Sequence, residues 1–215
     1  YARGINDRAL VHGKDQYVQV VSCNTHNISL LVHCLAMENG EKRLNLKRGR
    51  FLCMRRANDI SQDKSYIPSP QAGKHDDPEF GTHHARDAWH LFDTMGEKLS
   101  LFSSAMKLNT QYMHIIHFTL ELEEPTSLDR IKELMAAIPR VSTTVKRSAN
   151  QIFSFGRDNG HYGRILTQTV VSVPSLHMVN EREITGFCFT PQDGNSLLSS
   201  ASIATWFIHP EDYET

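Results

Sequence analysis

The first quarter of the chain alternates short apolar runs with polar turns. The stretch "QYVQVVS", residues 16–22, alternates and then becomes apolar, which predicts a strand. The stretch "SLLVHCLAM", residues 29–37, places its apolar residues on a helical stripe. A turn follows, and "RFLCMRRA", residues 50–57, is typical of a strand. The pattern therefore predicts that Cys23 lies between a strand and a helix N-terminus.

The middle of the chain predicts a long loop, a helix and two strands. Residues 60–82 contain three prolines and two glycines, and loops of this length in compact domains are often functional. The loop leads to His83 and His84 at the start of a helix predicted over 84–95. Residues 98–123 then have a strand-like pattern with one turn.

The last part of the chain predicts two more helices. The stretch 125–140, "PTSLDRIKELMAAIPR", has capping residues at its start, a proline near its end and an apolar stripe. That stripe consists of Ile131, Leu134, Met135 and Ile138. Residues 141–195 predict short strands and turns, with a hairpin near "EREITG", and residues 196–208 predict a final helix. This order of elements predicts an α+β fold whose mostly antiparallel or mixed sheet is covered by helices on one face.

Composition narrows the function classes. The chain has 215 residues, 40% of them hydrophobic, which is enough for one sizeable core. Its 23 basic and 24 acidic side chains leave a formal net charge of -1, so charge indicates neither nucleic acid nor a membrane surface as a partner. No apolar run approaches the roughly 20 residues that span a bilayer. Twelve histidines predict a strong response to pH between about 5 and 8.

The four cysteines show no CxxC pairing, which indicates reduced thiols in a cytoplasmic protein. Cys34 and Cys53 fall on apolar faces and are predicted to be core thiols. The chain starts without an initiator Met, and neither a GxGxxG fingerprint nor a Walker A motif occurs in it. We therefore expect further sequence upstream and a nucleotide-binding half outside these residues.

Cys23 is the candidate nucleophile. Backbone N–H groups at a helix N-terminus lower a thiol pKa and can stabilise an oxyanion beside it. The alternative is an inert buried thiol, because free cysteine is among the most buried residue types. Asn24 and Thr25 follow directly, and they either orient the thiol and bind a substrate oxygen or serve as ordinary helix caps.

An ordered set of motifs resembles a known family. "YVQVVSCNT" resembles the catalytic-cysteine segment of glyceraldehyde-3-phosphate dehydrogenases of the archaeal, type II branch. "MRRAND", "IPSP", "THHARD", "DTM", "YMH" and "LELEEPTS" follow in the family's order and cover about residues 15–140. The resemblance implies that residues 1–208 form the catalytic, C-terminal domain of such an enzyme, with 209–215 as a tail. It also implies a Rossmann domain before Tyr1, against which the last helix packs.

The resemblance implies a phosphorylating oxidation of a glyceraldehyde-3-phosphate-like aldehyde. NAD or NADP would be bound mainly by the domain outside this chain, and the enzyme would be a cytoplasmic homo-oligomer that uses inorganic phosphate. Arg55 or Arg56, with His83 and His84, would hold the anionic substrate groups, since guanidinium suits phosphate oxygens. The alternatives are a solvated strand edge and a surface pair of histidines. No third ligand stands near His83 and His84 at supporting spacing, so we assign no metal.

The general base is where the sequence departs from the family. The family carries Met-His-x-His on one strand, whereas this chain has "MHIIH". His114 matches the first histidine, Ile116 occupies the slot of the second, and His117 is displaced to the opposite face. Either His114 acts alone, or a bulge turns His117 to the site, or the base has been lost.

Three function classes therefore remain. The first is the NAD(P)-dependent phosphorylating aldehyde dehydrogenase, with Cys23 as nucleophile. The second is a non-catalytic descendant used as an assembly or binding module, and the third is another cysteine enzyme such as a thioester-forming acyltransferase. The family's cofactor-side motif appears only as "QDGNSLLSS", so cofactor contacts cannot be carried over. We also expect that the apolar residues of helix 196–208 make this chain expose an apolar patch, oligomerise or require its Rossmann half.

Overall fold

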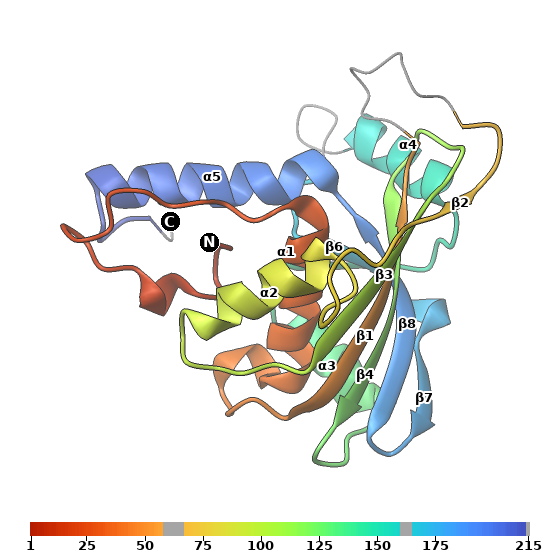
Figure 1. Ribbon diagram of the computed structural model, residues 1–215, viewed down its shortest axis with the longest axis horizontal. Coiled ribbons are helices and arrows are strands. Elements are labelled where there is room, and N and C mark those ends of the chain that lie inside the picture. The colour runs from red at the N-terminus through yellow and green to blue at the C-terminus, as the bar shows by residue number, and fades with distance from the viewer. Residues whose placement is uncertain (58–66, 160–164, 214–215) are drawn as a thin grey trace.

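The computed structural model describes residues 1–57, 67–159 and 165–213. Its centre is one mixed sheet of eight strands in the order β2-β3-β1-β4-β8-β6-β5, with β7 paired to β8 outside this path (Figure 1). The pairs β1–β3 and β5–β6 are parallel and the others are antiparallel. The strands are β1 Leu46–Arg55, β2 Gln71–Ala72, β3 Leu101–Lys107, β4 His114–Leu122, β5 Val141–Thr144, β6 Thr169–Ser172, β7 His177–Asn180 and β8 Glu183–Thr190.

Five α-helices accompany the sheet within the described residues. They are α1 Cys23–Leu31, α2 His83–Asp93, α3 Leu128–Ala136, α4 Ala149–Asn159 and α5 Gln192–Ile208. A π-helical turn, Val32–Ala36, continues α1, and 3-10 turns lie at Asp7–Ala9, Glu38–Gly40 and Val173–Ser175. Helices α1, α2 and α3 lie on one face of the sheet, while α5 extends away from it beside the N-terminal segment (Figure 1). The predicted α+β class and mixed sheet are confirmed.

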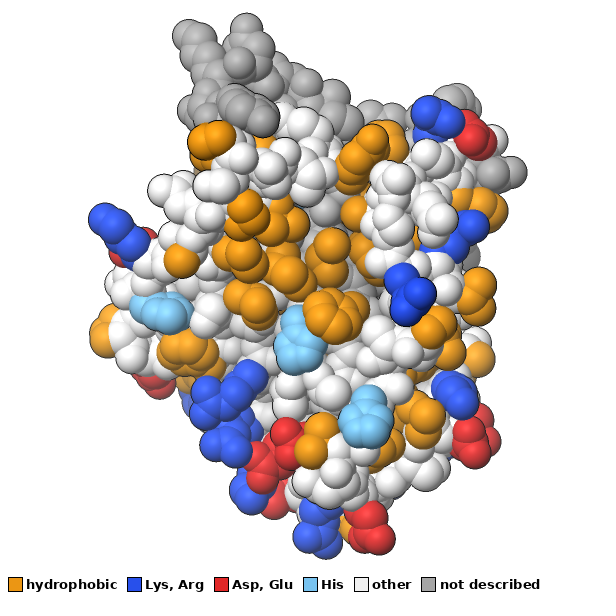
Figure 2. All heavy atoms as spheres, turned by 90° about the vertical axis from the view of Figure 1, so that its right-hand side faces the viewer, with side chains coloured by type: hydrophobic (Ala, Val, Ile, Leu, Met, Phe, Trp, Pro, Cys, Tyr) orange, Lys and Arg blue, Asp and Glu red, His pale blue; other side chains and the backbone are white. Residues whose placement is uncertain are grey.

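The strands show why the sheet has a covered and an open face. In β4 every second side chain is buried, starting at His114 and continuing through Ile116 and Phe118. Phe118 is fully buried and belongs to the same core cluster as Ile28 of α1 and Ile131 of α3. The intervening β4 residues are only partly buried, since most of the other face carries no helix. Figure 2 views that open face and shows apolar side chains and histidines on it.

Helix α4 was not predicted, because residues 141–195 were expected to contain only strands and turns. Its Ile152 packs in a small cluster with Met113, Val170 and Phe189. Phe189 pairs with Ile115 across β4–β8, on the face opposite the buried His114. Helix α4 thus covers one end of the open face, and its stability depends on this long-range packing rather than on its own periodicity.

The segment before Cys23 is also different from the prediction. Residues 16–22 form no strand, and α1 begins at Cys23, six residues before the predicted helix 29–37. Val18 and Val20 instead pack beside Tyr1, Ile203 and Trp206. Their alternation therefore reflects packing of an extended segment on α5 and on the N-terminus, where Tyr1 exchanges backbone hydrogen bonds with Gln19 and Val21.

Other predicted elements agree with the structure. Helix α3 lies inside the predicted 125–140, and Ser127 caps it by accepting a hydrogen bond from the Arg130 backbone N–H. Strands β7 and β8 form the expected hairpin at 181–186. The predicted loop 60–82 is described only from residue 67, and that part contains the short β2. In the described part of the chain, no helix is long and apolar enough to cross a membrane.

The final helix is only partly exposed. Trp206 is 4% exposed and is covered by residues of this same chain, so it does not need a further domain as a partner. Leu197, Phe207 and Ile208 are 51%, 41% and 72% exposed. The predicted exposed apolar patch is therefore present on α5, without Trp206.

Candidate active site

Cys23 is the first residue of α1 and is partly exposed. The carbonyl of Ser22 before it accepts hydrogen bonds from the backbone N–H of His26 at 2.9 Å and from the Nδ1 of His26 at 3.0 Å. Because a carbonyl only accepts, His26 carries its proton on Nδ1, and its Nε2 accepts from the Ser199 hydroxyl at 2.8 Å. His26 is fully buried, and it fixes the backbone turn that presents the thiol.

Asn195 holds the same turn from the other side. Its Nδ2 donates to the carbonyl of Cys23 at 3.0 Å and, more weakly, to the carbonyl of Gln168 at 3.4 Å. Asn195 lies in the first turns of α5 and is fully buried. Neither His26 nor Asn195 was predicted to have a role. Both residues stand among other polar residues at the start of their helices, so no signal in the sequence singled them out, and the partner of Asn195 is 172 positions away.

Asn24 and Thr25 are buried and bonded within the chain. The side-chain carbonyl of Asn24 accepts a hydrogen bond from the Thr190 hydroxyl at 3.2 Å. The Thr25 hydroxyl lies 2.9 Å from the hydroxyl of Ser22. These bonds fit the capping and anchoring alternative. They also connect α1 to the end of β8, where Thr190 pairs with His114 of β4.

The end of β1 brings two arginines to this site. Met54 pairs with Ile115, so Arg55 ends β1 beside the start of β4. The backbone N–H of Arg56 donates to Nδ1 of His114 at 2.9 Å. The guanidinium groups of Arg56 and Arg55 are close enough to Cys23 that their positive charges favour its thiolate form.

Helix α2 adds the two adjacent histidines. The ring centroids of His83 and His84 are 4.0 Å apart. His84 is 4% exposed, and neither of its ring nitrogens has a hydrogen-bond partner among the residues that the structure describes. Burial, together with smaller effects of the nearby His83, Arg55 and His114, lowers the pKa of His84 to about 3. His84 is therefore a neutral, buried ring.

The structure does not bring His117 to the site. The β4–β8 pairing runs without a register shift from His114 to Glu121, so the hypothesis of a bulge is wrong. The Thr185 hydroxyl donates to the carbonyl of Phe118 at 2.8 Å, and therefore accepts from Nε2 of His117 at 2.9 Å. His117 also contacts the Phe187 ring, with centroids 4.8 Å apart, on the open face of the sheet.

The acidity of Cys23 is opposite to the prediction. Burial raises the pKa of the thiol, and this effect exceeds the stabilisation of the thiolate by the backbone N–H of Asn24 and by the two arginines. The predicted core thiols Cys34 and Cys53 are confirmed as buried, and Cys188 is buried as well. Burial raises the pKa of Cys34 to about 12. Cys23 is the thiol with access to solvent among the four.

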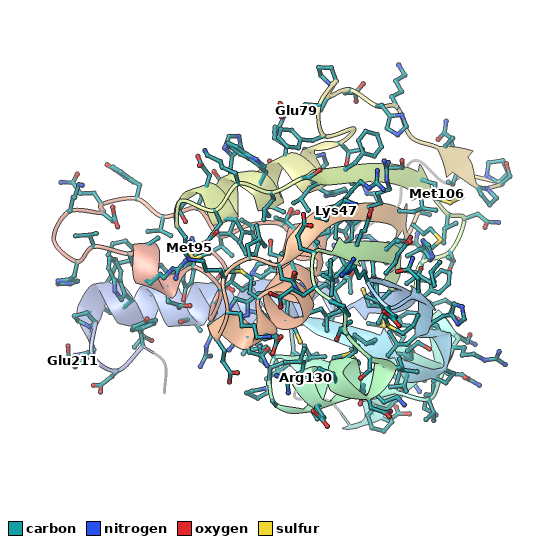
Figure 3. The ribbon with its side chains drawn as sticks, turned by 90° about the horizontal axis from the view of Figure 1, so that it is seen from below. Lys47, Glu79, Met95, Met106, Arg130 and Glu211 are labelled. Carbon is teal, nitrogen blue, oxygen red and sulfur yellow. The ribbon has the colours of Figure 1, made fainter. Side chains whose placement is uncertain are left out.

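Metal-binding side chains converge at a different place. His209, Glu211 and Asp212 have ligand atoms within 4.8 Å of one another, and all three are exposed. Glu211 lies beyond the end of α5, far from the sheet (Figure 3). Exposed carboxylates gather commonly without an ion, so we assign no metal there.

The fold and this geometry define an α+β domain with a thiol, two arginines and three histidines at one end of its sheet. No protein-family model matches the chain. Curated relatives do: a glyceraldehyde-3-phosphate dehydrogenase of Methanocaldococcus jannaschii is 28% identical over 182 residues, 80% of this chain and 48% of the relative. Another of Methanobacterium formicicum is 31% identical over 179 residues, 79% of this chain and 48% of the relative.

These matches show that most of this chain is similar to a region of archaeal glyceraldehyde-3-phosphate dehydrogenases. A similar protein of Methanosarcina barkeri is 29% identical over 153 residues, 68% of this chain and 40% of the relative. The chain thus spans about half the length, or less, of the curated relatives it matches.

Proposed function

We propose that this chain is the catalytic domain of an NAD(P)-dependent, phosphorylating aldehyde dehydrogenase that acts on a glyceraldehyde-3-phosphate-like substrate. The observation that supports this most is the convergence of Cys23, Arg55, Arg56, His84 and His114 at one end of the sheet. These residues come from four elements, the end of β1, the start of β4 and the starts of α1 and α2, and the curated relatives bear the name of such a dehydrogenase. The first two residues of α1 after Cys23 serve to anchor this end rather than to bind substrate.

The residues support the following chemistry. Cys23 loses its proton, and the thiolate adds to the aldehyde carbon, which forms a C–S bond and moves the carbonyl π electrons to oxygen. Loss of a hydride from that carbon restores the carbonyl and produces a thioester. A phosphate oxygen then attacks the thioester carbon and releases the acyl phosphate and the Cys23 thiolate. Arg55, Arg56 and His84 supply donors for the anionic groups of substrate and phosphate.

A nicotinamide cofactor supplies the hydride acceptor when bound. The sequence has no glycine-rich fingerprint between a strand and a helix, so this chain does not itself contain the usual dinucleotide-binding turn. We derive no step from cofactor contacts. The four free thiols suit a reducing, cytoplasmic setting, and the exposed residues of α5 suit association with another domain or subunit.

Turnover in the protein with its natural flanking sequence tests this function. We expect reduction of NAD or NADP, measured by absorbance, only when glyceraldehyde 3-phosphate and inorganic phosphate are both present. Cys23→Ser should lower the rate by more than about 10³-fold, because the nucleophile is lost. Cys34→Ala is the matched control, since Cys34 is a core thiol and should leave the rate unchanged within about twofold of wild type. Turnover that survives Cys23→Ser would contradict the proposal.

The anion contacts are tested separately. Arg56→Gln should raise the KM for phosphate by about tenfold to a hundredfold, the value of one or two charge-assisted hydrogen bonds. The control is Arg50→Gln, because Arg50 is an exposed residue of β1 that pairs with Phe102 and Thr119 away from this end. Equal effects of the two substitutions would show that general charge, rather than a site, attracts phosphate.

The raised pKa of Cys23 and the position of His117 on the other face favour a second candidate, a non-catalytic binding module. In that case no aldehyde is oxidised by the flanked protein, and iodoacetamide labels Cys23 at pH 7 no faster than a small free thiol. The arginines and histidines would then serve only to bind phosphate, and that binding would be detected because phosphate slows the labelling of Cys23.

A further inference from the structure

A pocket of about 560 Å³ lies between the N-terminal segment, the π-helical turn after α1 and helix α5. The charged and hydrogen-bonding residues that line it include Arg3, Asp7, His33 and Arg140, and we call it the Arg3–Arg140 pocket. His33 stands ten residues after Cys23 along α1 and the turn that continues it, which corresponds to about 15 Å of helix. The pocket is therefore separate from the site around the thiol.

The two arginines of the pocket are held in place by the fold. Nη2 of Arg140 donates to the carbonyl of Gly4 at 2.9 Å, and a Cβ at Gly4 would overlap the Arg140 guanidinium. Gln168 is fully buried and joins the two arginines, since its backbone N–H donates to the Arg140 carbonyl at 2.9 Å and its Nε2 donates to the Arg3 carbonyl at 2.9 Å. The Arg3 backbone N–H donates to the Ser199 hydroxyl at 3.1 Å. Because these parts are ordered in advance, a ligand loses little affinity in arranging them.

The lining of the pocket carries an excess of positive charge. Arg3 and Arg140 bring two positive charges, whereas Asp7 brings one negative charge. Oδ1 of Asp7 accepts a hydrogen bond from the Tyr1 hydroxyl at 2.7 Å, which stabilises that carboxylate within the chain. A ligand with a negative charge is therefore favoured in this pocket over a neutral or cationic one.

His33 adds an uncharged hydrogen-bonding group to the same pocket. It is 7% exposed, and burial, followed by the positive charges of Arg140 and Arg8, lowers its pKa to about 4, so the ring is neutral at pH 7. Nδ1 is sealed from solvent and has no hydrogen-bond partner in the described part of the chain. Nε2 lies beside the exposed Gly40, where an added Cβ would stand 3.3 Å from it. The single ring proton is therefore favoured on Nε2, because on Nδ1 it would be buried without an acceptor.

We propose that the Arg3–Arg140 pocket binds a small organic acid. The carboxylate or phosphate group accepts hydrogen bonds from the two guanidinium groups and from Nε2–H of His33. The carbon part of the acid packs on Leu166 and Leu198, which line the pocket as well. The volume lies within the range of about 300–1,000 Å³ that is typical of small-molecule sites. This binding does not depend on the reaction proposed for Cys23.

Saturation-transfer difference NMR tests the ligand class in the protein with its natural flanking sequence. The probes are 3-methylbutanoate, isopropyl phosphate and the neutral 3-methylbutan-1-ol, which shares the carbon skeleton of the first. We expect at least one of the two acids to bind with a midpoint below about 10 mM, and the alcohol to bind at least about tenfold more weakly. The acid that binds more tightly identifies the preferred anionic group. No saturable binding of either acid, or equal binding of the alcohol, overturns the proposal.

Substitutions locate the binding. All titrations use protein that carries Arg56→Gln, so that the phosphate contacts proposed near Cys23 are weakened in every sample. Arg140→Gln should weaken binding of the acid by about tenfold to a hundredfold, the effect of losing charge-assisted hydrogen bonds. Because Arg140 also holds Gly4, Arg3→Gln is the second variant, and its backbone hydrogen bonds to Ser199 and Gln168 remain.

The control for these variants is Arg50→Gln, which removes an exposed positive charge from β1 and should leave the midpoint within about twofold. Unchanged binding in the pocket variants whose unfolding curves match the reference protein overturns the proposal, as does an equal loss in Arg50→Gln. Dehydrogenase activity is not measured here, so a failure of the function proposed for Cys23 and a failure of this site are distinguishable.

Discussion

Asn195 is the residue whose replacement tests the architecture of the site most directly. It is fully buried, and its Nδ2 donates to the carbonyls of Cys23 and Gln168 at 3.0 and 3.4 Å. Asn195→Ala removes the donor of both bonds and leaves the side-chain space empty. We expect loss of stability together with loosening of the backbone that presents Cys23.

The loss in free energy of unfolding for Asn195→Ala can be worked out from the two hydrogen bonds. A typical intramolecular hydrogen bond contributes about 1 kcal/mol net, and the longer second bond contributes less. The small cavity and the poorly satisfied carbonyls add about 1 kcal/mol more, which gives a total of about 2–3 kcal/mol. For a chain of this size each kcal/mol lowers the melting temperature by about 2–4 °C, so Tm should fall by about 4–12 °C.

Urea unfolding followed by circular dichroism measures the loss of stability. The rate of iodoacetamide labelling of Cys23 measures the loosening of the backbone around the thiol. Labelling of Asn195→Ala should be faster than wild type at the same pH, since the thiol gains access to solvent. Ser200→Ala is the control, because Ser200 is an exposed residue of the same helix. A cost below about 0.5 kcal/mol, equal to that of Ser200→Ala, would refute the reasoning.

Two further predictions concern α2 and pH. Gly81 and Gly96 have φ of +75° and +79°, but a Cβ at Gly81 would lie 2.3 Å from a backbone oxygen whereas one at Gly96 meets nothing within 4 Å. Gly81→Ala should therefore cost about 1–3 kcal/mol more than Gly96→Ala in urea unfolding, and equal costs would contradict this close approach. Burial lowers the pKa of His26 and His33 to about 4 and of His84 to about 3, so the unfolded chain binds protons below about pH 6.5 that the folded chain does not. The contribution of these histidines to the free energy of unfolding should be complete above that pH. It should fall towards pH 4 by about 1.4 kcal/mol per pH unit for each group. A free energy of unfolding that does not change between pH 7 and pH 4 would exclude this prediction.

The sequence by itself determined much of the fold. Alternation in β4 separated His114 from His117, since neighbouring strand residues point to opposite faces, and the structure confirms that separation. The periodicity and caps of α3 determined its place and buried stripe. The apolar setting of Cys34 and Cys53 likewise indicated core thiols. These features are local, because the spacing of a few neighbouring residues encodes them.

Only the tertiary structure decided the site's chemistry. Asn195 reaches Cys23 across 172 positions, and the Arg56 amide reaches His114 across 58. Burial raises the Cys23 pKa against the local effect of a helix N-terminus, because desolvation depends on everything packed around the thiol. The segment 16–22 alternates like a strand, but it packs on α5 and shares backbone hydrogen bonds with Tyr1 rather than joining the sheet. Contacts of this kind depend on which distant segments the fold brings together, and residue spacing along the chain does not contain that information.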